Sequence, residues 1–180
     1  SYQNCLTVVS NDHTVVGELA ESIESDDATT WVYNLQKGVE FHNGKTMTAE
    51  DVVLNYQYHM NPDTASAAGG LLSQIDTISA DGANRVIFKL KGANADWPAI
   101  TTDYHIMIKP TKDGVVDAQS KIGTGPYIMD EFNPGVGSKF GKRNPNYFKG
   151  DSVAHFDSVE VIAINDPATR QAALLNGEID

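Results

Sequence analysis

The sequence predicts a mixed α/β fold, in which short strands and a few helices share a core. Apolar residues recur at every second position in Trp31–Leu35, as they do in a half-buried strand. They recur at helical spacing between Thr48 and Asn61, and a strand precedes a well-capped helix near Asp180. The chain has 180 residues, 41% of them apolar, which is enough for one domain or for one domain and part of another.

Short strands are expected in the first part of the chain. Cys5–Ser10 is an apolar strand candidate, and Asn11–His13 is expected to form the turn that follows it. After the Trp31–Leu35 strand, Val39–Phe41 predicts a second short strand. The dipeptide Asn43-Gly44 is typical of a turn that needs a positive φ angle.

The clearest helix signal begins at Thr48. Thr48 and Asp51 resemble a capping box, in which a hydroxyl and a carboxylate satisfy free backbone amides of the first helical turn. Asn61-Pro62 predicts the end, because the residue before a proline avoids the helical conformation. The residues expected to face the core are Ala49, Val52, Val53, Tyr56 and Met60.

The middle of the chain predicts a strand pair between less regular segments. Ala65–Leu72 is rich in small residues and is compatible with either a short helix or a loop. Ile75–Ala80 and Val86–Leu90 are expected to form a hairpin-like pair. Asp96–Thr102 predicts a helix with a proline in its first turn, and Ile106–Ile108 predicts a short strand.

The last third predicts a second hairpin and a terminal helix. Tyr127–Phe132 and Ser138–Arg143 are the expected hairpin strands, and Phe156–Ile164 is the next strand. Asp166 is expected to cap the final helix, and Gly177 to end it in the left-handed conformation. A parallel crossover would need a further strand after this helix. The expected buried side of the helix consists of Ala168, Ala172 and Leu175.

Charge and cysteine content exclude several classes of function. With 13 basic and 24 acidic residues, the formal net charge is −11, which argues against a nucleic-acid-binding surface. The single cysteine, Cys5, excludes an internal disulfide, and we interpret it as a small buried residue rather than a lipid anchor. No stretch approaches the ~20 apolar residues of a membrane-spanning helix.

The chemistry expected of an enzyme or metal site is not evident in the sequence. The five histidines show no paired metal-ligand spacing, so we expect no metal and no cofactor. Gly123–Pro126 lacks the ending of a phosphate-binding loop, and the Gly-x-Ser-x-Gly pattern of serine hydrolases is absent. We expect His42 to form local hydrogen bonds beside the Asn43-Gly44 turn, and the aromatic set Trp31, Tyr33, Phe41 and Tyr56 to belong to the core.

Three separated motifs resemble those of one protein family. The first, WVYNLQKGVEFHNGKTMTAED, covers Trp31–Asp51; GTGPY follows at Gly123–Tyr127, and RNPNYFKG at Arg143–Gly150. The last residues, DPATRQAALLNGEID at Asp166–Asp180, also match the family's helix. The chain thereby resembles the family 5 solute-binding proteins of ABC importers, which include dipeptide, oligopeptide and nickel receptors.

This resemblance implies a fold and a function. The expected fold is periplasmic binding protein-like II of the dipeptide-binding type, incomplete because family members are much longer. Residues 1–122 are expected to form one α+β lobe with a mixed sheet, and residues 123–180 the crossover and start of the adjoining sheet domain. The resemblance implies a monomer that is either periplasmic or lipid-anchored on the outer cell face. It also implies that this monomer captures a peptide or other small solute between two lobes and delivers it to an ABC permease and its ATPase.

Two segments correspond to family positions that face the cleft between the lobes: Ala68, Gly69, Gly70 and Asp103, Tyr104, His105. Relatives carry an aromatic residue in the first segment, so the small residues here imply a roomier cleft. Tyr104 and Asp103 could receive an ammonium group of a ligand. Peptide, nickel chelate, sugar, opine and haem stay open as ligands, and the alternative functions are a secreted hydrolase or a chaperone or sensor of the same family.

Overall fold

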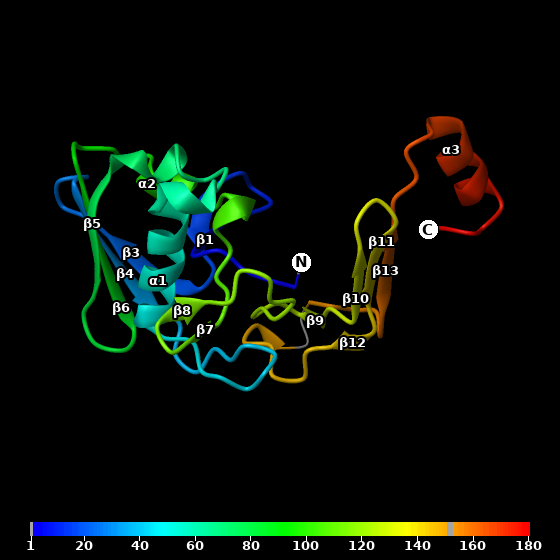
Figure 1. Ribbon diagram of the computed structural model, residues 1–180, viewed down its shortest axis with the longest axis horizontal. Helices are drawn as coiled ribbons and strands as arrows, with labels where there is room; N and C mark the ends of the chain where they lie inside the picture. Colours follow the sequence, from blue (N-terminus) through cyan, green and yellow to red (C-terminus); the bar gives the residue numbers. More distant parts are fainter. Residues whose placement is uncertain (1, 151–152) are drawn as a thin grey trace.

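A four-stranded antiparallel sheet dominates the first two thirds of the chain. The computed structural model describes residues 2–150 and 153–180. The sheet has the strand order β3-β4-β6-β5, and α1 covers one of its faces (Figure 1). We call residues 2–122 the first lobe. Its main elements are β1 (Thr7–Val9), β2 (Val15–Gly17), β3 (Ala20–Glu24), β4 (Thr30–Leu35), α1 (Ala49–Met60), β5 (Ile75–Ala80) and β6 (Arg85–Leu90).

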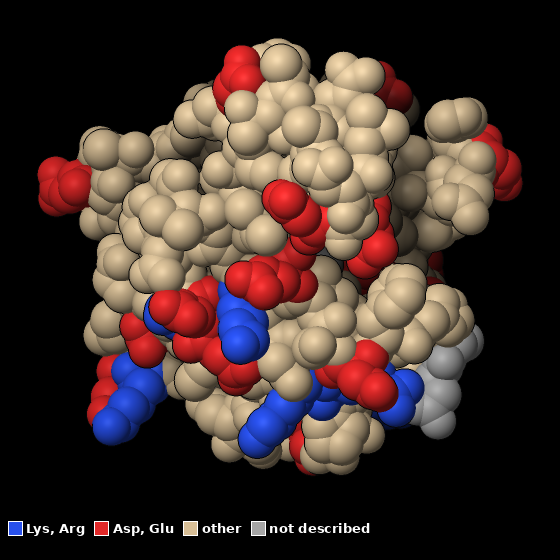
Figure 2. Space-filling view, turned by 90° about the vertical axis from the view of Figure 1, so that its right-hand side faces the viewer, with Lys and Arg blue, Asp and Glu red and all other residues tan. Residues whose placement is uncertain are grey.

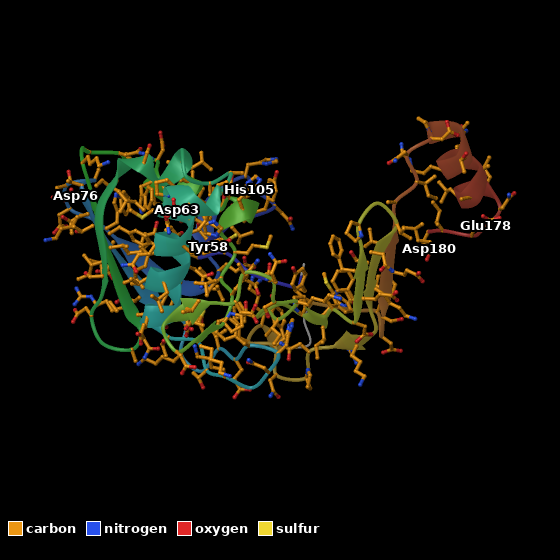
Figure 3. The ribbon with its side chains drawn as sticks, in the orientation of Figure 1. Tyr58, Asp63, Asp76, His105, Glu178 and Asp180 are labelled. Atoms are coloured by element: carbon orange, nitrogen blue, oxygen red, sulfur yellow. The ribbon has the colours of Figure 1, made fainter. Side chains whose placement is uncertain are left out.

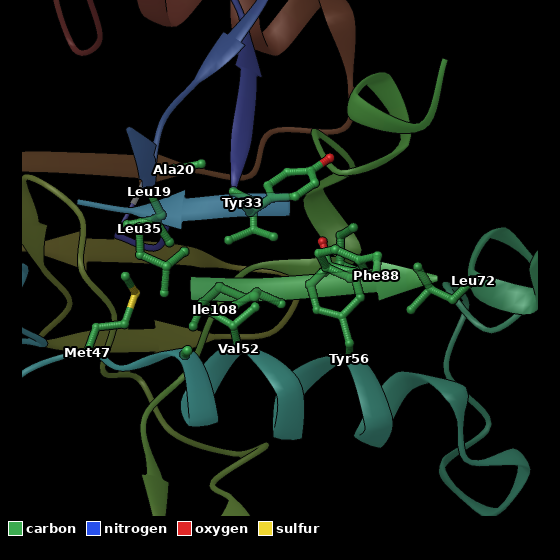
Figure 4. Packing of buried hydrophobic residues seen from close by; sticks show 14 of the residues in the cluster. Leu19, Ala20, Tyr33, Leu35, Met47, Val52, Tyr56, Leu72, Phe88 and Ile108 are labelled. Atoms are coloured by element: carbon green, nitrogen blue, oxygen red, sulfur yellow. The ribbon is translucent and has the colours of Figure 1, made fainter. Parts of the chain in front are cut away.

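The core of the first lobe lies between this sheet and α1. Figure 4 shows Val52 and Tyr56 of α1 pointing toward the sheet, as the helical spacing predicts. Phe88 of β6 packs edge-on against the rings of Tyr33 and Tyr56, with ring centroids 5.1 and 5.0 Å apart, and lies 5.3 Å from the ring of Trp97. Edge-to-face pairs of this kind add to the stabilisation from buried apolar area. The expected core role is therefore confirmed for Tyr33, Phe41 and Tyr56, whereas Trp31 is only partly buried and packs against the core.

Helix α1 begins and ends where the sequence predicts. The Asp51 carboxylate accepts hydrogen bonds from Thr48 N and Thr48 Oγ1, both at 3.0 Å, at the first turn. Asn61 has an extended conformation and is followed by Pro62, which opens a short 3₁₀ turn, η1 (Pro62–Thr64). Ala65–Leu72 then consists of turns that lead into η2 (Leu71–Gln74), so the loop alternative holds for most of this segment.

Two expected strands do not form. Val39–Phe41 contains only one isolated bridge, between Glu40 and Thr46. Ile106 is the last residue of a 3₁₀ turn, η3 (Tyr104–Ile106), and residues 107–108 join no ladder. Apolar residues fill the core in both places, but a strand also needs a neighbouring edge, and Pro110 and the Asp103 cap favour a turn instead. The remaining elements of the lobe are α2 (Trp97–Ile100), β7 (Thr111–Lys112) and β8 (Val115–Val116).

The expected second hairpin forms, with a break in the middle of each strand. It consists of β9 (Tyr127–Ile128) paired with β12 (Lys142–Arg143) and β10 (Glu131–Asn133) paired with β11 (Gly137–Phe140). At Gly141 a Cβ atom would lie 1.9 Å from Asp130 Oδ2, so a larger residue there would displace the Asp130 side chain. β13 (Val159–Ile162), shorter than expected, pairs antiparallel with β11.

The terminal helix α3 (Pro167–Leu175) forms with the expected caps, but its expected buried side is wrong. Asp166 Oδ1 accepts from Thr169 N at 2.8 Å, and Gly177 has φ of 71°. Only Ala173 is buried, whereas Ala168, Ala172 and Leu175 are exposed. Figure 1 shows α3 beyond the β10–β11–β13 sheet, far from the first lobe. Within the described residues no layer packs on the expected side.

Every ladder in residues 2–150 and 153–180 is antiparallel, so a mixed sheet with parallel pairs is not formed there. No helix in this part of the chain is long and apolar enough to cross a membrane. The expected domain boundary between residues 122 and 123 stays a prediction.

Candidate functional site

Both segments expected to contact a ligand lie beside the last turn of α1. His59 connects them: its Nδ1 atom is 2.6 Å from Ser66 Oγ, close to the Ala68–Gly70 segment. The charge of His105 also acts on His59, which places the Asp103–His105 segment nearby. Figure 3 labels Tyr58 and His105 on this part of the first lobe. Residues separated by more than thirty positions thus form one surface, which we call the α1-end surface (His59, Ser66, residues 68–70 and 103–105).

The three small residues of this surface have different environments. Ala68 is fully buried, and its carbonyl accepts the Leu72 amide at 3.1 Å as η2 begins. Gly69 is close-packed, because a Cβ there would lie 3.3 Å from Ser66 O and 3.4 Å from His59 O. Gly70 is exposed, and a Cβ there would meet nothing within 4 Å. Of the three, Gly70 is the residue whose backbone faces open space.

The second segment presents one large exposed side chain. Asp103 Oδ1 accepts from His105 N at 2.9 Å and from His105 Nδ1 at 2.7 Å, so these contacts already occupy one oxygen of the carboxylate. The Tyr104 ring lies 3.9 Å from the His105 ring and is 68% exposed. Behind them, burial raises the pKa of Cys5 to about 12, so its thiol stays protonated and donates to Asp103 O at 3.3 Å. Tyr104 is therefore the side chain on this surface best placed to meet a solute.

Sequence reasoning missed the His59–Ser66 contact. The two residues are seven positions apart across the turn at Pro62, and no spacing rule signals such a pair. Burial lowers the pKa of His59, and the charges of Lys109 and His105 lower it further, which favours a neutral imidazole. A hydroxyl beside a neutral imidazole resembles a nucleophile and its base, but among the described residues no carboxylate bonds to His59 and orients it.

The three sequence motifs meet at the crossover, Gly123–Tyr127. His42 Nε2 donates to Gly125 O at 2.9 Å, and Gly123 N donates to His42 Nδ1 at 3.2 Å. Asn144 Nδ2 donates to the same Gly125 carbonyl at 3.1 Å. A Cβ at Gly123 would lie 2.0 Å from Tyr2 O, so only glycine allows this approach. The expectation that His42 bonds locally is wrong: its partners lie 81 and 83 positions along the chain.

A hollow of about 550 Å³ lies between the end of the first lobe and the β10–β11–β13 sheet. Lys109 and Lys121 contribute to it from the first lobe, and Phe132, Phe140 and Val161 from the sheet. In the described part of the chain, no group of three or more His, Cys, Asp or Glu side chains could hold a metal ion.

Comparison with known protein families shows which family this chain is related to. Residues 14–180 match the family model described as bacterial extracellular solute-binding proteins, family 5 Middle. The chain belongs to this family. The motifs that converge at the crossover are thus motifs of a family 5 protein, as the sequence resemblance indicates.

Curated relatives include the oligopeptide-binding protein AppA of Bacillus subtilis, 30% identical over 173 residues, with 90% of this chain and 31% of that protein covered. The glutathione-binding protein GsiB of Pectobacterium atrosepticum is 30% identical over 177 residues, with 93% and 33% covered. This family 5 chain therefore spans about a third of the length of these relatives.

Solved structures of the same fold agree. The structure of AppA from Bacillus subtilis in complex with a nonapeptide has a TM-score of 0.86 and 26% identity, over 99% of this chain and 37% of that one. The structure of AgaA from A. tumefaciens R10 in complex with agropinic acid has a TM-score of 0.89 over the same shares, with 24% identity. The periplasmic binding protein-like II fold, incomplete in this family 5 chain, is confirmed.

Proposed function

We propose that this chain is part of the substrate-binding component of an ABC importer, which captures a peptide or related small solute in a cleft between two lobes. The observation that carries the proposal is the family match over residues 14–180. Similar proteins are named for binding oligopeptides and glutathione, and a similar structure holds agropinic acid. Capture requires no bond to be broken, only two lobes that close around the solute.

The α1-end surface is our candidate for the contact of the first lobe with the solute. Tyr104 offers an exposed ring for packing and a phenol for hydrogen bonding. Gly70 offers exposed backbone, whereas Ala68 is fully buried and supports this surface from beneath. Asp103 and His105 would hold Tyr104 in place rather than bind an ammonium group on their own, because they pair with each other. This arrangement favours an extended or bulky solute over a small cation.

The proposed setting follows from the same family. A family 5 receptor works in the periplasm or, lipid-anchored, at the outer cell face, and hands its solute to a permease that its ATPase drives. We propose the same setting here, with the receptor as a monomer. The hollow beside Lys109 and Phe132 supports a cleft on this side of the first lobe, because it lies between the lobe and the next sheet.

One observation favours a second function, a secreted hydrolase. Ser66 Oγ lies 2.6 Å from His59 Nδ1, within the distance that proton transfer needs. The Ser66 hydroxyl also accepts from Ala68 N at 3.2 Å, which suits a turn-stabilising serine. Hydrolysis of an ester panel that is lost in Ser66→Ala would support this alternative, whereas solute binding that survives the substitution supports the receptor.

Native mass spectrometry of the whole protein tests the proposal. The protein, purified without denaturation, is expected to carry a peptide or small solute that denaturation releases. Tyr104→Ala is expected to weaken binding of that solute about tenfold, about 1.4 kcal/mol, because the exposed ring is lost. Val115→Ala is the matched control, since Val115 is also 68% exposed but lies in β8.

Two results would count against this proposal. A protein that carries no solute, and binds none from a peptide library, contradicts the receptor function. Equal weakening by Tyr104→Ala and Val115→Ala contradicts the location of the site while leaving the function in place.

A further inference from the structure

We propose that neutral His42 is a positioning residue that ties the first lobe to the crossover, and that protonation of its ring releases the tie. The hydrogen bonds carry this proposal. Both ring nitrogens are engaged, Nδ1 by the Gly123 amide at 3.2 Å and Nε2 by the Gly125 carbonyl at 2.9 Å. The His42 amide adds a third bond, to Gly123 O, at 2.9 Å.

These partners determine the tautomer. An amide N–H can only donate, so Nδ1 must be unprotonated and accept the Gly123 hydrogen bond. A carbonyl can only accept, so Nε2 must carry the proton and donate to Gly125. The ring is therefore neutral, with its single proton on Nε2. A second proton would go to Nδ1, where it would face the Gly123 N–H and break that bond.

The connection holds together segments that are distant in sequence. The turn that contains His42 belongs to the first lobe, whereas Gly123–Tyr127 leads into β9. Gly123 cannot move toward the N-terminal segment, because the Cα hydrogen that a Cβ atom would replace already faces Tyr2 O. Three bonds persist without the ring: His42 N to Gly123 O at 2.9 Å, Gly125 N to Tyr2 O at 3.0 Å, and Asn144 Nδ2 to Gly125 O at 3.1 Å. Protonation of His42 would thus free the Gly123 amide and weaken the tie without detaching the segment.

The surroundings favour the neutral ring. Burial lowers the pKa of His42, and the Gly125 bond raises it by a smaller amount. The titratable groups on the elements around it are Tyr2 from the N-terminal segment, Glu40 and Lys45 from its own turn, and Arg143 and Tyr147 beside Asn144. Burial raises the pKa of Tyr2 and Tyr147, so both phenols stay neutral where a histidine titrates.

The direction of the pH effect follows from linkage. In the closed form the His42 ring bonds to Gly123 and Gly125, and in the open form these two bonds are broken. The open form exposes His42 to water, where its pKa returns to about 6.5. Because the closed form has the lower pKa, the open form binds more protons as the pH falls. The equilibrium therefore favours the closed form most strongly above about pH 6.5. The ratio of the closed to the open form decreases as the pH falls from there toward the lowered pKa, by at most about tenfold per pH unit.

Two measurements on the whole protein test this inference. With ¹⁵N-labelled histidine, the Nδ1 signal of His42 is expected to be of the unprotonated type and the Nε2 signal of the protonated type at pH 7.5. Hydrogen exchange of Gly123, corrected for intrinsic pH dependence, is expected to lose up to about tenfold in protection between about pH 6.5 and 5.5. Neither measurement needs a bound solute, so the outcome is separate from the proposed function.

Variants show whether His42 is the cause. His42→Asn retains an acceptor near the Nδ1 position but does not titrate, so Gly123 protection is expected to become flat over this range. His155→Asn, at an exposed histidine, is expected to retain the full pH dependence. An Nδ1-protonated ring, or a pH dependence that persists in His42→Asn, would overturn the inference. If His42→Asn does not fold, the tautomer of the unmodified protein decides alone.

Discussion

Asp51, Asn55 and His59 follow one another at intervals of four along α1 and give the helix a polar side within the lobe. The Asn55 side chain bonds both backbone groups of Lys109, with Nδ2 donating to O at 2.8 Å and Oδ1 accepting from N at 3.1 Å. Asp51 accepts from Thr111 N at 3.1 Å and from Thr111 Oγ1 at 2.6 Å. Buried side chains thereby satisfy backbone groups of Lys109 and Thr111, which fixes the segment after Tyr104 against α1.

Asp51→Asn is expected to destabilise the protein by about 3 kcal/mol, since it removes the charge of a buried carboxylate that pairs with half-exposed Lys45, and it weakens the helix cap. The Lys45 ammonium forms this ion pair with the fully buried carboxylate. Urea unfolding at pH 7 measures the loss. Asp76→Asn, at an exposed position of β5 labelled in Figure 3, is expected to change stability by less than about 0.5 kcal/mol. Equal losses in the two variants would contradict the special role of Asp51.

The same substitution is expected to flatten the acid dependence of stability. Burial alone would raise the pKa of Asp51, but the bonds from Lys45, Thr111 and Thr48, with the Lys45 charge, lower it overall. A lowered carboxyl pKa gives stability that is complete above the unfolded value of about 3.9 and is lost as the pH falls through the folded value. The free energy of unfolding should therefore fall less between pH 5 and 3 in Asp51→Asn than in the unmodified protein.

At the scale of elements, local sequence signals predicted the bounds of α1 correctly. They failed where the formation of an element depends on a partner that is distant in the sequence. Thr48, Asp51 and Pro62 fix α1 through contacts within a few residues, and the sequence shows all of them. Val39–Phe41 has strand composition but gains only one bridge, because whether a ladder forms depends on a neighbouring edge. The same holds for His42. The motif around it is visible in the sequence, but its hydrogen-bond partners lie 81 and 83 residues away and could not be predicted from neighbouring residues.

In the candidate site, too, the sequence shows which residues share a loop but not which side chains contact each other. Ser66 and His59 meet only because η1 folds the chain back beside α1. The sequence placed Asp103 and Tyr104 in one loop but could not show that Asp103 is bonded to His105, which leaves Tyr104 as the exposed group. The assignment of these residues to a ligand stays a prediction.

Strand β6 holds the core of the first lobe through Phe88. Phe88→Ala is expected to cost about 4 kcal/mol, because the cavity would remove the ring against which Tyr33, Tyr56 and Trp97 pack. Denaturant unfolding of the whole protein measures this loss. Phe132→Ala is the control: Phe132 is 51% exposed in β10, and its loss should cost less than about 1 kcal/mol. A cost at Phe132 as large as at Phe88 would contradict the location of the core.

At the scale of the whole molecule, buried apolar area is concentrated in the first lobe. The connected core cluster runs from Leu6 to Ile108, and no buried member comes from β9–β13 or α3. In the C-terminal sheet and helix, Val161, Ile162 and Leu175 are exposed instead. Figure 2 shows basic side chains only in the lower half of the face that carries this part, with acidic side chains spread over it. This face lacks the continuous basic patch that nucleic acid binding requires.

The unequal core leads to a prediction about solute binding by the 180 residues alone. A solute held between two lobes needs both walls in fixed positions, and the ordering of a loosely held wall costs binding free energy. The C-terminal sheet is tied to the first lobe through the crossover rather than through a shared core. We therefore expect the 180-residue chain to bind the solute of the whole protein at least about a hundredfold more weakly, a loss of about 2.8 kcal/mol.

Isothermal titration calorimetry with the solute released from the whole protein makes this comparison. Circular dichroism of the 180-residue chain is the control, because a folded first lobe must be present for weak binding to be informative. The same micromolar affinity in the isolated chain and in the whole protein would contradict the prediction. It would mean that the α1-end surface and the hollow beside Phe132 suffice for capture, and that closure of a second lobe adds no affinity.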